Sequence, residues 1–76
     1  MEPTRLGKSI GAKAARSVIA RFAGKRDGAL EKAWPEGSRH QVFLLNDQRV
    51  VDVFLKSARL YASADEFRQD RAATAS

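Results

Sequence analysis

The chain has no cysteine among its 76 residues and only one histidine, His40. Without cysteine it can form no disulfide, no thiolate zinc site and no cysteine nucleophile. Small secreted domains usually depend on disulfides, so we expect a reducing, cytoplasmic location. A single imidazole makes a common transition-metal site only where several carboxylates gather around it. We therefore expect no metal and no other cofactor.

Long apolar runs are also missing. The most apolar region, residues 42–55, is interrupted by polar residues such as Asn46 and Asp52, and we expect no membrane span because a crossing helix needs roughly 20 apolar residues. The content of 43% hydrophobic and 30% charged residues indicates a folded domain with a thin core. We predict a single small domain over residues 1–72 and a flexible tail over residues 73–76.

Acidic residues are scarce in the first third of the chain. Residues 1–26 hold seven basic residues and one acidic residue, a net charge of +6, whereas residues 27–76 hold seven basic and eight acidic residues, a net charge of −1. Charge segregated in this way attracts polyanions over a long range, with an affinity that depends on salt. The alternative interpretation is that these basic residues have no binding role and form the solvated side of an ordinary amphipathic helix. A membrane-surface helix is disfavoured because the segment has no tryptophan.

A helix is predicted for this basic segment, with Thr4 as its N-cap and Gly24 as its end. Apolar residues recur at every fourth position and predict one stripe along the helix: Leu6, Ile10, Ala14, Val18 and Phe22. The opposite side carries basic residues. Gly7 and Gly11 either weaken the first turns or allow another backbone to approach closely.

The middle of the chain predicts a short helix and then a β-hairpin. Asp27 can cap a helix that ends at Trp34, before the turn formed by residues 35–38. A two-residue loop at Asn46-Asp47 predicts that Phe43 lies opposite Val50. One face of the hairpin then carries Val42, Leu44, Val51, Val53 and Leu55, and the other carries Phe43, Leu45, Val50 and Phe54.

Both hairpin faces are apolar, so each needs a covering layer. The basic helix can supply one; the second is a C-terminal helix, a third strand near residues 59–61, or another protein chain. Ser63 and Glu66 have the spacing of a capping box, which starts a helix that reaches about Ala72 and packs at the periphery through Phe67. The predicted fold is α+β: an N-terminal amphipathic helix and a short second helix packed on an antiparallel hairpin of two or three strands, followed by a short C-terminal helix.

No catalytic motif is complete. Gly7-Lys8-Ser9 resembles the end of a phosphate-binding loop, but that motif needs a glycine at the position of Glu2 and a strand before it. His40 and Asp52 lie on neighbouring strands, but the predicted register places Gln41 opposite Asp52, so we interpret His40 as a solvated or capping residue. We expect no enzymatic activity.

Two functional hypotheses remain. The first is a small non-enzymatic regulatory module that binds nucleic acid, DNA or RNA, or another anionic surface through the basic helix. Its contacts would be Arg5, Lys8, Lys13, Arg16, Lys25 and Arg26. The alternative is a protein-interaction module, an inhibitor or adaptor, that docks on a partner or forms a homodimer through the hairpin. Its interface would be Val42, Leu44, Val51, Val53 and Leu55.

Overall fold

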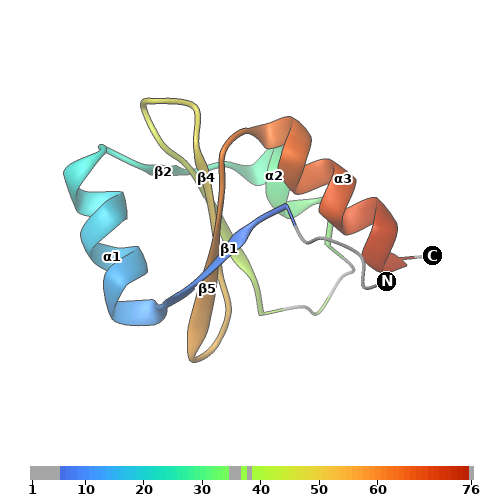
Figure 1. Ribbon diagram of the computed structural model, residues 1–76, viewed down its shortest axis with the longest axis horizontal. Coiled ribbons are helices and arrows are strands. Elements are labelled where there is room, and N and C mark those ends of the chain that lie inside the picture. Colours follow the sequence, from blue (N-terminus) through green and yellow to red (C-terminus); the bar gives the residue numbers. More distant parts are fainter. Residues whose placement is uncertain (1–5, 35–36, 38, 76) are drawn as a thin grey trace.

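The computed structural model describes residues 6–34, 37 and 39–75 and shows three layers: a central antiparallel sheet with α1 on one face and α2 and α3 on the other (Figure 1). The chain order is β1 (Lys8–Gly11), α1 (Ala12–Arg21), β2 (Lys25–Arg26), α2 (Gly28–Glu31), β3 (Gln41–Leu44), β4 (Val50–Val53), β5 (Ser57–Tyr61) and α3 (Ala64–Ala75). The five strands are ordered β1-β5-β4-β3-β2. The predicted hairpin of two or three strands was therefore wrong. The predicted cap at Thr4 and most of the predicted turn at 35–38 lie outside the described residues.

Strand β1 replaces the first turns of the predicted N-terminal helix, and a glycine explains why. The backbone of Gly7 passes so close to β5 that an added Cβ would lie 2.5 Å from Arg59 Cγ and 2.7 Å from Tyr61 Cε1. Arg59 Nη1 donates a hydrogen bond of 2.8 Å to the Gly7 carbonyl oxygen. The glycine thus permits the close approach that was one of its two predicted roles.

Helix α1 is shorter than predicted and turns a different stripe toward the sheet. Ala15 is fully buried, and Val18, Ile19 and Phe22 pack around it, whereas Ala14 is exposed. A strict spacing of four residues drifts by about 40° per step around an α-helix, so the predicted stripe could not stay on one face. The observed set has the mixed spacing of three and four residues that one helix face requires.

The hairpin between β3 and β4 has a three-residue loop, Asn46-Asp47-Gln48, instead of the predicted two. Leu45 N donates to Arg49 O at 2.8 Å, Gln48 N donates to Leu45 O at 3.0 Å, and Gln48 takes a left-handed conformation with φ of 77°. This is the usual build of a three-residue hairpin loop. The extra residue pairs Leu44 with Val50 and Val42 with Asp52. The predicted register was therefore wrong by one residue, which exchanges the two faces of β4.

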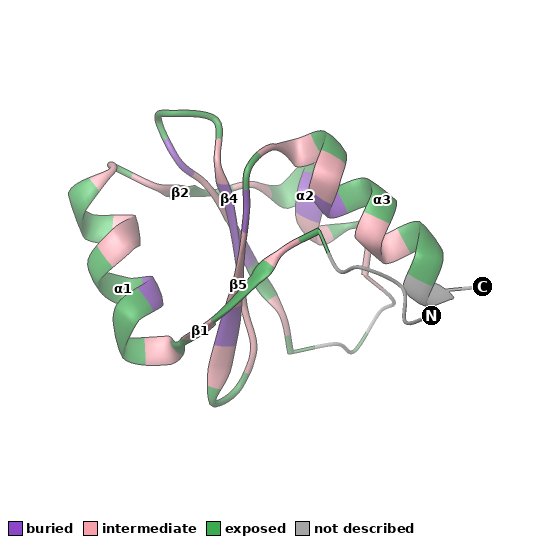
Figure 2. Cartoon of the chain, in the orientation of Figure 1, coloured by how far each residue is buried: buried purple, intermediate pink, exposed green. Residues whose placement is uncertain are grey.

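Two apolar clusters fill the space on either side of the sheet (Figure 2). The cluster under α1 consists of Ala15, Leu45, Val51 and Ala58. The cluster under α2 and α3 consists of Leu30, Val42, Val50, Tyr61 and Phe67. Phe67 is fully buried and meets the Tyr61 ring edge-on at 5.3 Å, and it is the one buried residue among those of α3 whose burial is described. Both hairpin faces are covered from within the chain.

The helix caps that were predicted for α2 and α3 are confirmed. Asp27 Oδ1 accepts hydrogen bonds from the backbone N–H groups of Ala29 at 2.9 Å and Leu30 at 3.3 Å. The Glu66 N–H donates to Ser63 Oγ at 3.3 Å. Helix α3 continues to Ala75, beyond its predicted end near Ala72. No helix in the described part of the chain has the length and apolar character needed to cross a bilayer.

Candidate functional site

The basic residues of the first third are distributed over three elements rather than along one helix. Lys8 lies on β1 at one edge of the sheet, and Lys25 and Arg26 lie on β2 at the opposite edge. Of the predicted contacts, α1 carries only Lys13 and Arg16. The prediction that Lys8 lies with Lys13 and Arg16 on one helix was therefore wrong, and Arg5 lies outside the described residues.

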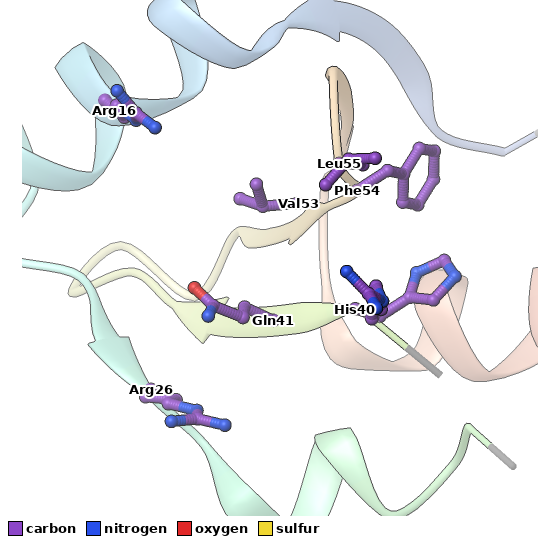
Figure 3. A pocket seen from close by; sticks show the side chains of 8 residues that line it. Arg16, Arg26, His40, Gln41, Val53, Phe54 and Leu55 are labelled. Carbon is purple, nitrogen blue, oxygen red and sulfur yellow. The ribbon is translucent and has the colours of Figure 1, made fainter. Parts of the chain in front are cut away.

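Folding nevertheless brings two of the predicted contacts to one cleft. Arg16 reaches it from α1 and Arg26 from β2, and Figure 3 shows Gln41 between them. The cleft has a volume of about 490 Å³, and none of the described residues that line it is acidic: Arg16, Arg26, Arg39, His40, Gln41, Val53, Phe54 and Leu55. It joins segments that are distant in sequence, so its positive charge arises only in the folded chain.

The three arginines of the cleft differ in how free their charges are. Arg16 and Arg39 are exposed and make no ion pair with any residue that the structure describes. Arg26 Nε donates to Glu31 Oε1 at 2.8 Å, but the Arg26 side chain remains 62% exposed. An exposed pair of this kind is worth little in water, so it does not hold Arg26 away from a stronger anionic ligand. Planar guanidinium groups suit phosphate because they can donate two parallel hydrogen bonds.

His40 closes one end of the cleft and is held by a buried acid. Its Nδ1 lies 2.9 Å from Oδ1 and 3.2 Å from Oδ2 of Asp52, whose side chain is fully buried. The observed register places Asp52 opposite Val42, so residues 40 and 52 share one face of the sheet. The interpretation of His40 as a solvated or capping residue was wrong, because it depended on the incorrect register.

Aromatic contacts fix the His40 ring further. Trp34 stacks on it with ring centroids 3.6 Å apart and planes 15° apart, and Phe54 meets it edge-on at 4.6 Å. The guanidinium group of Arg71, on α3, lies over the Trp34 ring, 3.7 Å from its centroid. It also donates hydrogen bonds to the Ala33 carbonyl oxygen. The start of β3, and with it Arg39, is thereby anchored to α2 and α3.

Burial raises the pKa of Asp52, because an ionised carboxylate loses its hydration inside the protein. The hydrogen bond and charge of His40 offset part of this effect, as do the positive charges of Arg71 and Arg59. The His40–Asp52 pair therefore holds the start of β3 in place, although burial of the carboxylate is electrostatically unfavourable. This cost makes Asp52 a sensitive point for pH.

The residues predicted as a partner interface do not form one surface. Val42 and Leu44 pack under α2 and α3, whereas Val51 and Val53 pack under α1. Leu55 lies apart from both clusters, 72% exposed, between β4 and β5. The one-residue change of register accounts for this separation.

Sequence reasoning did not assign Arg39, Gln41 and Phe54 to the site. Arg39 lies outside the basic segment. Gln41 lies in β3 and Phe54 directly follows β4, so the side of the sheet on which each lies depends on the register. The sequence feature that could have identified these site residues is the run Arg39-His40-Gln41 at the start of a predicted strand. This run could be assigned to a face of the sheet only with the correct length of the loop that begins at Asn46, because that length sets the register.

Within the described ranges, no three side chains of His, Cys, Asp or Glu lie close enough together to hold a metal ion. The chain matches no protein-family model, and no curated protein and no solved structure is significantly similar to it.

Proposed function

We propose that this chain is a small non-enzymatic regulatory module that binds the phosphate backbone of nucleic acid in the cleft between α1 and β2. The observation that supports the proposal best is the convergence of Arg16, Arg26 and Arg39 on one hollow whose described lining residues include no acid. Each phosphate that binds a guanidinium group releases condensed counterions, which favours association. The absence of cysteine fits a cytoplasmic location.

The remaining basic residues would extend the attraction beyond the cleft. Lys13 is exposed on α1 and Lys25 is exposed on β2, the two elements that supply Arg16 and Arg26. These lysines raise the positive potential near the cleft and would speed the encounter with a polyanion. Lys8, on the far edge of the sheet, is expected to contribute less.

The test is a charge reversal of the two arginines without ion pairs among the described residues, in the double variant Arg16→Glu/Arg39→Glu. Binding of a fluorescent oligonucleotide, measured by anisotropy, should weaken by at least about tenfold because two phosphate contacts become repulsive. For the native chain, a plot of log affinity against log salt should have a slope of roughly −2, since three contacts to a single strand contribute about 0.7 each.

The single variant Arg16→Glu is compared with the matched control Arg68→Glu, which makes the same change of charge on α3, on the other side of the sheet. The Arg68 side chain is 60% exposed, so the substitution should leave the fold unchanged, as circular dichroism would verify. Equal loss of binding in Arg68→Glu and Arg16→Glu would show that only total charge matters, and would reject the cleft as the site.

A further inference from the structure

Part of the cleft wall is apolar, which phosphate binding alone does not require. Val53, Phe54 and Leu55 line the cleft together with the arginines (Figure 3). The Phe54 N–H donates to the Ser57 carbonyl oxygen at 2.7 Å, and this tight turn presents Leu55 to solvent. The flat face of an unpaired base can pack against such a wall, in the way that bases pack on aromatic side chains.

A second hollow of about 280 Å³ continues the cleft toward the middle of α1. It shares Arg16, Gln41 and Val53 with the first hollow, and Ile19 and Phe43 provide apolar surface. Hollows of this size suit small ligands rather than a rigid double helix. Consecutive nucleotides of a flexible single strand can enter the two hollows in turn, whereas the bases of a duplex are paired and stacked inside it.

Gln41 adds a group that can read a base edge. Its side chain is exposed and lies between Arg16 and Arg26 in the view of Figure 3. An amide both donates and accepts hydrogen bonds, whereas the neighbouring guanidinium groups only donate. The cleft therefore combines charge, apolar surface and one neutral polar group, as expected for contact with both phosphate and base.

We propose that the cleft binds single-stranded nucleic acid in preference to duplex. Phosphates contact Arg16, Arg26 and Arg39, and bases pack against Phe54 and Leu55. This inference rests on the proposed function and specifies its ligand. Charge complementarity and the apolar wall together favour a single strand over an acidic peptide, because guanidinium groups can also stack on bases.

The experiment compares four probes by anisotropy and competition: a labelled single-stranded DNA of about ten nucleotides, its duplex, inorganic polyphosphate and polyglutamate. The protein variants are Leu55→Ser and the matched control Leu6→Ser, which changes the other exposed leucine, 39% accessible and just before β1. The native chain should bind the single strand about tenfold more tightly than the duplex. Leu55→Ser should weaken single-strand binding by about threefold or more and leave the competition by polyphosphate unchanged, and Leu6→Ser should change neither.

The possible failures are distinguishable. If neither DNA probe binds, the proposed function itself is wrong. If duplex and polyphosphate bind as tightly as the single strand, nucleic-acid binding survives but the single-strand preference does not. If Leu55→Ser has no effect, the packing of bases on the apolar wall is refuted. Displacement of the strand by polyglutamate at equal charge would overturn the inference in favour of an acidic protein partner.

Discussion

At the scale of single residues, Asp52 is the least expected feature of the chain. It is a fully buried carboxylate in an otherwise apolar strand, opposite Val42 on one side and Arg59 on the other. Hydrogen bonding to His40 compensates only in part for its lost hydration, because its pKa remains raised above 3.8. Buried polar pairs of this kind often contribute to a specific arrangement rather than to net stability.

The raised pKa of Asp52 makes a prediction about stability and pH. The folded chain holds a proton on Asp52 at pH values where the unfolded chain has released it. This contribution to stability is complete below pH 3.8 and is lost as the pH rises through the folded-state pKa. Asp52→Asn cannot ionise. The free energy of unfolding of this variant, relative to the native chain, should therefore increase as the pH rises above 3.8.

Urea titrations at several pH values would measure this difference. Asp65→Asn is the control, because the Asp65 side chain is 84% exposed and its ion pair with Arg68 spans 3.7 Å. Its difference from the native chain should change little over the same range. A gap between Asp52→Asn and the native chain that stays constant with pH would contradict a buried carboxylate with a raised pKa.

At the scale of elements, the end of α1 shows how two adjacent small residues play different roles. Ala23 takes a left-handed conformation with φ of 51°, and the Gly24 N–H donates to the Ile19 carbonyl oxygen at 2.9 Å. This is a Schellman motif in which alanine stands at the position that usually holds glycine. A Cβ on Gly24 would lie 2.7 Å from Leu45 Cδ2, so the glycine serves close packing instead.

Substitutions at these two positions should have opposite effects. Ala23→Gly should raise the free energy of unfolding by about 0.5 kcal/mol, because relief of left-handed strain exceeds the added entropy of the unfolded chain. Gly24→Ala should lower it by about 1–3 kcal/mol through overpacking against the buried Leu45. Denaturation followed by circular dichroism measures both values. A destabilising Ala23→Gly would show that position 23 is not strained.

Helices and strands were predictable where their formation depends on residues close together in the sequence. Asp27 and Ser63 cap α2 and α3 as their sequence patterns predict, because a cap depends only on neighbouring backbone groups. Strand β1 was missed because its pairing with β5 joins residues about fifty positions apart, such as Lys8 and Leu60. The hairpin register was missed because it depends on one loop residue, Gln48, which accepts a left-handed conformation without being glycine.

At the scale of the whole molecule, the excess positive charge of the first third was visible in the sequence, but its arrangement was not. Folding places Lys8 and Lys25 on opposite edges of the sheet and brings Arg16 and Arg26 together with Arg39. Arg39 belongs to the part of the chain with a slightly negative net charge, so no compositional argument could include it. The candidate site is thus a product of topology.

The most direct test of the cleft is to map bound single-stranded DNA on the ¹⁵N-labelled protein by changes in amide chemical shifts. The account predicts changes at Arg16, Arg26, residues 39–41 and residues 53–55, which line the hollow, and none along α3 on the other side of the sheet. Unlike a substitution, this measurement leaves the native chain intact. Changes centred on α3 or on the β1 edge would contradict the account.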